Sequence, residues 1–345
     1  MNMHTQLIKT KQSENMNKVA LITGGAGFIG SHLAERLIRE GFKVLAFDNL
    51  TTGSRSNLSR IIGHPNFEFV LGDITNEEQL SRLVKKSDIV FHLAAAVGVK
   101  LIVDDPLTSM MTNIRGTEVI LNLALKWNKK ILLASTSEVY GKNAKVPFSE
   151  EDDLVFGNTT KTRWSYACSK AIDEYLAIAH HRENDLPVTV VRFFNTVGHR
   201  QSDQYGMVLP TFINQALRGD PITVHGSGDQ RRTFTHVRDT VDATFRLALN
   251  KNSIGEVYNI GGSIEISMMD LAIAVRERLN SHSEIKTIPY EMAFGDSGFE
   301  DMQRRVPDCR KIDKLIGYQP RHTIENMIDD VADFYEPVMP SAAIG

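Results

Sequence analysis

Cysteine is scarce in this sequence of 345 residues, which contains only Cys168 and Cys309. Two cysteines cannot build a disulfide framework, and they fit a reducing cytoplasm. No apolar stretch approaches the length that a membrane-spanning helix needs. Residues 1–17 are polar and lack the apolar core of a secretory signal. We therefore expect a disordered tail at 1–17 and a cytoplasmic location with no membrane partner.

An excess of basic residues is also missing, since the formal net charge is -3. A nucleic-acid-binding protein usually carries a basic surplus or stripe, so we expect no nucleic-acid partner. Eleven histidines are present, but none has the spacing of a zinc protease, and we predict no metal site. A length of 345 residues suits one large domain, or a main domain with a smaller lobe.

Short apolar runs and helical stretches alternate from residue 18 onward. This alternation predicts a parallel sheet with helices on both faces, which is an α/β fold of the doubly wound type. We expect this domain to cover residues 18–195. The predicted buried strands lie at 19–23, 44–47, 67–71, 89–93, 131–134 and 188–193.

Beyond residue 195 the pattern is less regular, with turn signals at Gly226 and Gly261. The hydrophobic spacing predicts helices at 207–218, 238–250 and 267–280. We expect residues 196–345 to form a smaller α/β lobe that closes over the mouth of the sheet and binds substrate. Some crossing of the chain between the two parts is part of this prediction.

Three glycines, Gly24, Gly27 and Gly30, lie between the first predicted strand and the first predicted helix. A dinucleotide's pyrophosphate needs glycine here, because a side chain would block its close approach to the backbone. The helix N-terminus adds amide donors and partial positive charge. The alternative is a glycine turn that merely packs strand against helix, and the strand–loop–helix context favours the nucleotide site of a Rossmann domain.

Asp48 ends the second predicted strand, about 20 residues beyond the glycine loop. An acid there accepts the ribose hydroxyls and repels a 2′-phosphate, which predicts NAD rather than NADP. Asp73 ends the third strand, where it would meet the adenine edge or cap the next helix. The predicted cofactor-binding residues are Gly24, Gly27, Phe28, Ile29, Gly30, Asp48, Asn49, Asp73, Ile74, Leu93, Ala94, Ala95, Tyr166 and Lys170.

Tyr166 and Lys170 are four residues apart, so they share one face of a predicted helix over 165–182. A nearby ammonium favours phenolate, and we expect Lys170 to lower the pKa of Tyr166. A phenolate beside a nicotinamide can take the hydroxyl proton of an alcohol while the cofactor takes the hydride. The Tyr-x-x-x-Lys spacing is common by chance, and it indicates a catalytic pair here because a glycine-rich nucleotide loop lies upstream.

The Gly24–Gly27–Gly30 loop together with Tyr166 and Lys170 resembles the extended short-chain dehydrogenase/reductase family. The resemblance covers the chain from residue 18 onward and implies an NAD-dependent enzyme that acts on a nucleotide sugar. It also implies that Thr136 hydrogen-bonds the sugar oxygen shared with Tyr166. In this family the sugar is oxidised at C4 and the hydride returns to it, so that no external reductant is consumed. Family members are usually homodimers through a helix bundle that includes the Tyr166 helix.

Ser137 and Glu138 follow Thr136 and bear on the reaction. Residues 132–141 resemble UDP-xylose synthase, and 163–168 resemble the decarboxylase of the lipid A aminoarabinose pathway. The resemblance implies catalytic roles for Thr136, Ser137, Glu138, Tyr166 and Lys170, and decarboxylation of UDP-glucuronate is our best prediction. The alternatives are a 4-epimerase, then a 4,6-dehydratase. A non-enzymatic NAD-sensing scaffold is disfavoured because the catalytic residues are present.

Two departures from the decarboxylases are visible. Leu101 and Ile102 stand where that branch presents a polar residue and a tyrosine, and His199 replaces a proline. The family resemblance also implies a substrate-binding set that grips a UDP-sugar by its diphosphate, ribose and base. The predicted substrate-binding residues are Lys100, Asn195, Val224, Arg232 and Arg305.

Overall fold

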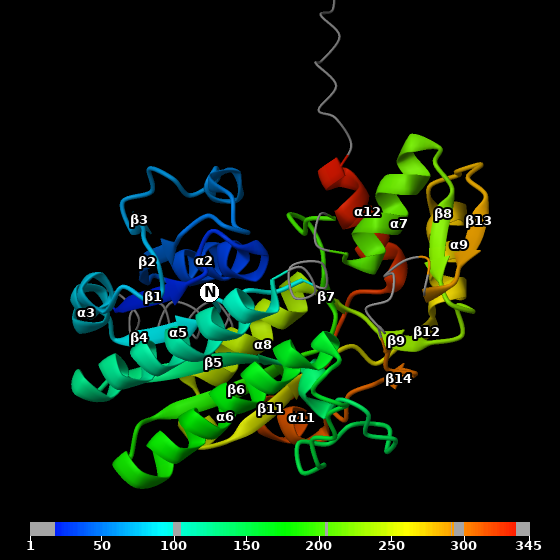
Figure 1. Ribbon diagram of the computed structural model, residues 1–345. Coiled ribbons are helices and arrows are strands. Elements are labelled where there is room, and N and C mark those ends of the chain that lie inside the picture. The colour runs from blue at the N-terminus through cyan, green and yellow to red at the C-terminus, as the bar shows by residue number, and fades with distance from the viewer. Residues whose placement is uncertain (1–17, 99–104, 204–205, 291, 293–299, 336–345) are drawn as a thin grey trace, which may run out of the picture.

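The computed structural model describes residues 18–98, 105–203, 206–290, 292 and 300–335. Its centre is a parallel sheet of seven strands in the order β11-β6-β5-β4-β1-β2-β3 (Figure 1). The chain winds outward from β1 in both directions, which confirms the doubly wound Rossmann prediction. The strands are β1 (Val19–Thr23), β2 (Lys43–Asp48), β3 (Phe67–Leu71), β4 (Ile89–His92), β5 (Lys130–Thr136), β6 (Val188–Phe193) and β11 (Val257–Ile260).

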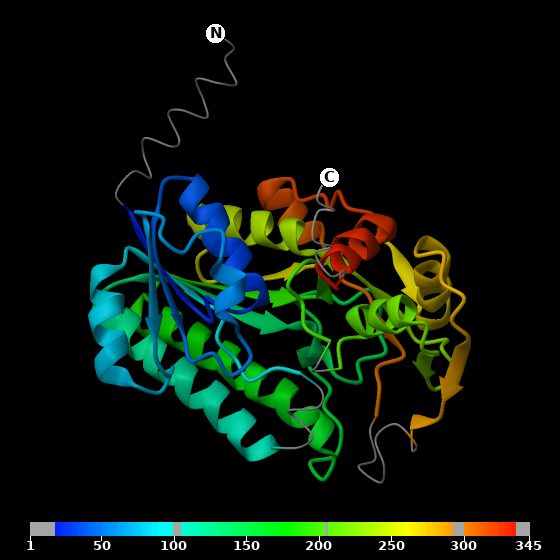
Figure 2. The same ribbon diagram turned by 90° about the horizontal axis from the view of Figure 1, so that it is seen from above.

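Helices cover both faces of the sheet, as Figure 2 shows from above. One face carries α2 (Phe28–Arg39), α8 (Val237–Leu249) and α11 (Arg310–Ile316), and the other carries α3 (Glu77–Lys86), α5 (Pro106–Lys126) and α6 (Ser165–Asn184). The helices bury apolar stripes against the strands, because each sheet face is too hydrophobic to meet water. Leu33 and Leu37 of α2 are fully buried in one core, and Leu80 and Leu121 are fully buried in the other.

Two strands differ from the sequence-based prediction. The run 67–71 was expected to be buried, but β3 is the edge strand and Leu71 is 53% exposed. The seventh strand, β11, was not predicted, because its four residues follow segments of the smaller lobe. It pairs with β6 in parallel, so the chain returns to the sheet after the predicted boundary at residue 195.

The smaller lobe holds α7 (Val208–Arg218), α9 (Met268–Arg278) and α12 (Ile324–Tyr335), which lie beside the sheet in Figure 1. Its core contains Phe212, Leu271 and Ile328. The helices confirm the predictions at 207–218 and 267–280, and α8 confirms the one at 238–250. The lobe strands are β8 (Ile222–His225), β9 (Arg231–Thr233), β12 (Glu265–Ser267), β13 (Ile285–Ile288) and β14 (Arg304–Arg305).

A parallel sheet brings the carboxyl ends of its strands to one edge, and this edge positions the site. Thr23, Asp48, His92 and Thr136 all end strands there. The loops that follow these strands face the smaller lobe. Across the described ranges, no helix combines the length and the apolar character that crossing a membrane requires.

Candidate active site

A cleft of roughly 800 Å³ lies between the carboxyl edge of the sheet and the smaller lobe. It runs from the glycine loop past α6 to β8 and β9. Most residues predicted for the site line this one cleft, although they come from segments that lie between residues 24 and 305 of the sequence. The predicted residues that line it are Gly24, Gly27, Phe28, Ile29, Gly30, Asp48, Asn49, Asp73, Ile74, Leu93, Ala94, Ala95, Thr136, Ser137, Glu138, Tyr166, Lys170, Asn195, Arg232 and Arg305.

Two predicted substrate residues do not line the cleft as described. Val224 is fully buried in the core of the smaller lobe, while its neighbours Thr223 and His225 line the cleft. In a strand, alternate side chains point to opposite faces, so Val224 offers only its main chain to this side. Lys100, like Leu101 and Ile102, lies outside the described residues.

The glycine loop fits a pyrophosphate. Gly24 has a φ of +73°, and a Cβ there would lie 2.8 Å from the Ala94 amide nitrogen. A Cβ on Gly30 would lie 2.1 Å from the Gly24 carbonyl oxygen. Neither Gly24 nor Gly30 therefore has room for a side chain, and the loop presents bare backbone at these two positions. Helix α2 begins at Phe28, so its free amides face the cleft.

Asp48, the residue predicted to meet a ribose, lines the cleft at the end of β2. Its carboxylate accepts hydrogen bonds from the amides of Ala26 (2.9 Å) and Leu50 (2.7 Å) and is 8% exposed. Burial raises the pKa of Asp48, although these backbone hydrogen bonds oppose the rise. Asp73 accepts from Asn49 at 3.1 Å and does not cap α3, whose cap is the Asn76 side chain. The predicted capping role of Asp73 is therefore wrong.

Tyr166 and Lys170 lie on the first turns of α6 and are 7% and 2% exposed. The Tyr166 hydroxyl is hydrogen-bonded to Thr136, the last residue of β5. The prediction that the pKa of Tyr166 is lowered is wrong. Burial raises this pKa, and the negative charges of Glu138 and Asp173 add to the rise. The Lys170 ammonium is engaged by Asp173, with 2.6 Å from Nζ to Oδ2.

Glu138 lies in a short 3₁₀ helix after β5 and is held by two arginines. Arg163 Nη2 is 2.5 Å from Glu138 Oε2, and Arg305 pairs with Oε1. Burial would raise the pKa of Glu138, but the charges of Arg163 and Arg305 lower it to about 2. Glu138 is therefore ionised at neutral pH and poorly suited to exchange protons. The neighbouring Ser137 hydroxyl is buried, lines the cleft and has no hydrogen-bond partner within the part of the chain that the structure describes.

The far end of the cleft is lined by polar groups of the smaller lobe. Arg232 Nη2 lies 2.8 Å from Asp301 Oδ1, and the Tyr290 hydroxyl donates to the other oxygen of Asp301. Asn195, at a positive φ of 25°, donates its side-chain amide to the Thr233 carbonyl oxygen at 2.7 Å. Guanidinium groups at this end suit the phosphate oxygens of a nucleotide sugar.

Three charged residues of the site were not assigned roles from the sequence, namely Arg163, Asp173 and Asp301. Arg163 stands three residues before Tyr166, and a charged residue so close to a predicted catalytic motif was an available signal. Asp173 stands three residues after Lys170, on the same helix face. Asp301 gave no sequence signal, because its partner Arg232 is 69 residues away.

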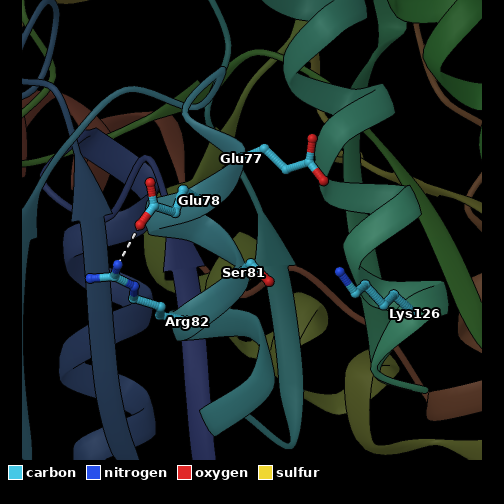
Figure 3. Close-up of a pocket in the computed structure, with 5 residues that line it drawn as sticks. All are labelled: Glu77, Glu78, Ser81, Arg82 and Lys126. Atoms are coloured by element: carbon cyan, nitrogen blue, oxygen red, sulfur yellow. Dashed lines mark hydrogen bonds and ion pairs between the residues drawn. The ribbon is translucent and has the colours of Figure 1, made fainter.

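A second pocket lies between α3 and α5, on the outside of the sheet domain. Figure 3 shows Glu78 and Arg82 of α3 forming an ion pair there, with Lys126 of α5 opposite. None of the predicted site residues lines it. Within the described ranges, no three His, Cys, Asp or Glu side chains gather in a way that could hold a metal ion.

The family model described as GDP-mannose 4,6 dehydratase matches residues 21–331. The chain belongs to this family. Its members are NAD-dependent dehydratases, epimerases and decarboxylases of nucleotide sugars, which confirms the predictions of an extended short-chain dehydrogenase/reductase, of an enzyme and of NAD. The glycine loop, the α2 N-terminus and Asp48 fit that cofactor.

Two curated relatives within the family are decarboxylases by name. A UDP-N-acetyl-alpha-D-glucosaminuronate decarboxylase of Bacillus cytotoxicus is 40% identical over 94% of this chain and 99% of its own length. A UDP-glucuronic acid decarboxylase 1 of Xenopus tropicalis is 35% identical over 94% of this chain and 73% of its own. Among solved structures, a dTDP-glucose 4,6-dehydratase of Bacillus anthracis in complex with NAD is 29% identical, with a TM-score of 0.80 over 92% of this chain and 96% of that one.

Proposed function

We propose that this protein is an NAD-dependent decarboxylase of a UDP-uronate. The sugar is UDP-glucuronate, as the sequence predicts, or its 2-acetamido counterpart, as the 40% identical relative suggests. The observation that carries the proposal is the arginine cluster beside Tyr166. Glu138 holds Arg163 and Arg305, Asp301 holds Arg232, and all three guanidinium groups line the cleft, where they would attract the carboxylate and the phosphates of a UDP-uronate.

The reaction begins at the hydroxyl on C4 of the sugar. Thr136 and Tyr166 hold this hydroxyl between them, and the Tyr166 phenolate takes its proton. The glycine loop and Asp48 would hold NAD, which would supply a reversible hydride acceptor for C4, so that no external reductant would be consumed. The resulting C4 ketone lies β to the substrate carboxylate.

The next step breaks the bond between C5 and the carboxylate carbon and releases carbon dioxide. The electron pair of that bond passes to C5 and the C4 oxygen, which Thr136 and Tyr166 stabilise by hydrogen bonds. A proton from solvent water then adds to C5, and reduction of the C4 ketone, with the Tyr166 proton returning to its oxygen, gives the UDP-pentose. Glu138 is ionised, and its ion pairs with Arg163 and Arg305 support a role in positioning these two arginines rather than in moving protons.

Arg232 and Arg305 are proposed to hold the diphosphate, with Asn195 at the turn beside it and the main chain around Val224 near the base. Residues 18–195 would supply most of the NAD site and residues 196–345 most of the UDP site. Lys100 keeps its proposed contact with the substrate.

The test is turnover of the two UDP-uronates labelled with ¹³C in the carboxylate. We expect labelled carbon dioxide and a UDP-pentose without added reductant, and neither from Tyr166→Phe. Conversion of UDP-glucose to UDP-galactose without carbon dioxide would instead identify a 4-epimerase. A 4-keto-6-deoxy product would identify a 4,6-dehydratase, and bound NAD without any turnover would identify a scaffold.

We further propose a cytoplasmic homodimer. Helices α5 and α6 pack side by side on one face of the sheet and turn their outer surfaces away from it (Figure 2). Tyr175 on α6 is 72% exposed and Leu107 on α5 is 71% exposed. Exposed apolar side chains of this size on adjacent helices are typical of a helix-bundle interface.

A further inference from the structure

Asp173 lies behind the Tyr166–Lys170 pair on the same helix, α6. Its Oδ2 accepts a hydrogen bond from Lys170 Nζ at 2.6 Å. Asp173 is fully buried and Lys170 is 2% exposed, so little water screens the two charges. Asp173 does not line the cleft, whereas Tyr166 and Lys170 do. Asp173 therefore acts on the reaction from behind the cleft, through its contact with Lys170 and through its charge near Tyr166.

Polar groups of other elements hold Asp173 in place. The Thr117 hydroxyl of α5 hydrogen-bonds to its carboxylate. Thr117 Oγ1 is in turn 3.2 Å from His92 Nε2 on β4, and His92 Nδ1 is 2.7 Å from Thr23 Oγ1 on β1. A buried polar chain therefore runs from the helix of the catalytic pair to the strand that precedes the glycine loop. Such networks restrict the side chains that they join, and Asp173 Oδ1 is the one atom of this chain of groups without a hydrogen-bond partner among the described residues.

The other charged side chains near Tyr166 and Lys170 form ion pairs of their own. Glu138 and Arg163, which face Tyr166 from the loop side, form an ion pair with each other. Glu174, the neighbour of Asp173, is bound by Arg192 of β6 at 2.7 Å.

His92 of β4 also faces Lys170. Burial, helped by the charge of Lys170, lowers the pKa of His92 to about 3, so this imidazole is neutral at physiological pH. Among the residues that the structure describes, Asp173 is thus the carboxylate that forms an ion pair with Lys170.

We propose that Asp173 is a positioning residue that partly neutralises the Lys170 ammonium and so sets the pH range in which Tyr166 accepts the substrate proton. This inference rests on the proposed role of Tyr166 as the base. An ammonium favours phenolate, and a carboxylate in contact with that ammonium cancels much of its field. In line with this, burial raises the pKa of Tyr166, and the charges of Glu138 and Asp173 raise it further.

The variant Asp173→Asn keeps the shape of the side chain and removes its charge. Because the phenol must lose its proton to act as the base, the rate falls as the pH drops below the pKa of Tyr166. Without the Asp173 charge, the Lys170 ammonium acts at full strength on the phenol. We expect the acidic limb of the kcat/KM profile to move to lower pH by about one unit, with bound NAD unchanged. Thr117→Ser, which retains the hydroxyl, should leave the limb in place.

Asp173→Ser tests the same point if the asparagine variant does not fold, since it also removes the charge. A limb that stays in place or moves to higher pH in a folded variant, even with a lower rate at every pH, overturns the proposal. Full turnover by Tyr166→Phe would instead overturn the proposed role of Tyr166. An inactive Tyr166→Phe with an unmoved limb in Asp173→Asn would remove only the role of Asp173.

Discussion

Glu138, which follows β5 of the sheet domain, forms an ion pair with Arg305 on β14 of the smaller lobe, 167 residues further along the chain. The same carboxylate forms an ion pair with Arg163, which lies just before α6, the helix that carries Tyr166. One side chain therefore aligns the proposed diphosphate arginine with the proposed catalytic helix. The relative position of the two parts of the molecule and the geometry of the site depend on each other through this carboxylate.

Replacing Glu138 by Gln should disturb both the geometry of the site and the relative position of the two parts of the molecule. We expect kcat to fall by about tenfold to a hundredfold, because Arg163 and Arg305 lose the anion that orients them. The protein should also lose stability at neutral pH, because two guanidinium groups are left without their carboxylate. Steady-state kinetics and thermal unfolding measure the two effects. Unchanged kcat in a folded variant would contradict the positioning role.

The pH dependence of stability gives a second test of Glu138. Its pKa in the folded protein is about 2, below the ordinary value of about 4.3. Its charge therefore stabilises the fold fully above pH 5, and this contribution is lost as the pH falls toward 2. The difference in Tm between wild type and Glu138→Gln should narrow over that range. Glu78→Gln, which breaks only the exposed pair with Arg82, should change Tm little at any pH.

Gly30→Ala should abolish tight binding of NAD. The new Cβ would lie 2.1 Å from the Gly24 carbonyl oxygen, so the loop must move, at a cost of about 1–3 kcal/mol in unfolding free energy. The NAD content of the purified protein and its Tm report the two losses. Gly63→Ala is the control, because a Cβ there meets nothing within 4 Å, although Gly63, unlike Gly30, has a positive φ. It should lose some stability and keep its NAD.

Asp48→Asn should relax the choice between NAD and NADP. The carboxylate that repels a 2′-phosphate becomes neutral, and a charge-assisted hydrogen bond to the ribose is weakened. We expect NAD to bind about tenfold more weakly and NADP more tightly, as measured by calorimetry on protein stripped of nucleotide. Asp73→Asn, in the same cleft, should not alter the ratio of the two affinities. A wild-type preference retained by Asp48→Asn would exclude Asp48 as the selector.

Tyr175→Glu should separate the proposed dimer. This position on α6 is 72% exposed, and a charge buried between two subunits is costly. Light scattering coupled to size exclusion should show the mass of one chain, while circular dichroism remains unchanged. Leu71→Glu, on the exposed edge strand β3, is the control and should leave the mass at two chains. A wild-type mass of one chain would refute the dimer.

Local patterns were enough to predict most of the sheet and the nucleotide loop. Short stretches of sequence predicted β1, β4 and β6 from their apolar runs, and they predicted the nucleotide loop from the glycine spacing between Gly24 and Gly30. Strand β11 was not predicted, because a run of four residues becomes a strand only through its pairing with β6. The burial of β3 was overestimated for the same reason, since a strand's place in the sheet is a long-range property.

The sequence by itself determined the fold class and the family, and it located the segment that contains the proposed proton acceptor. Tyr166 and Lys170 could be paired from their spacing, because a helix relates residues four apart. Only the tertiary structure decided the charge around that pair. Asp173 engages the ammonium, and Glu138 is held between Arg163 and Arg305. The physical reason is that a pKa depends on burial and on charges within a few ångströms, and these come from residues that are distant in the chain.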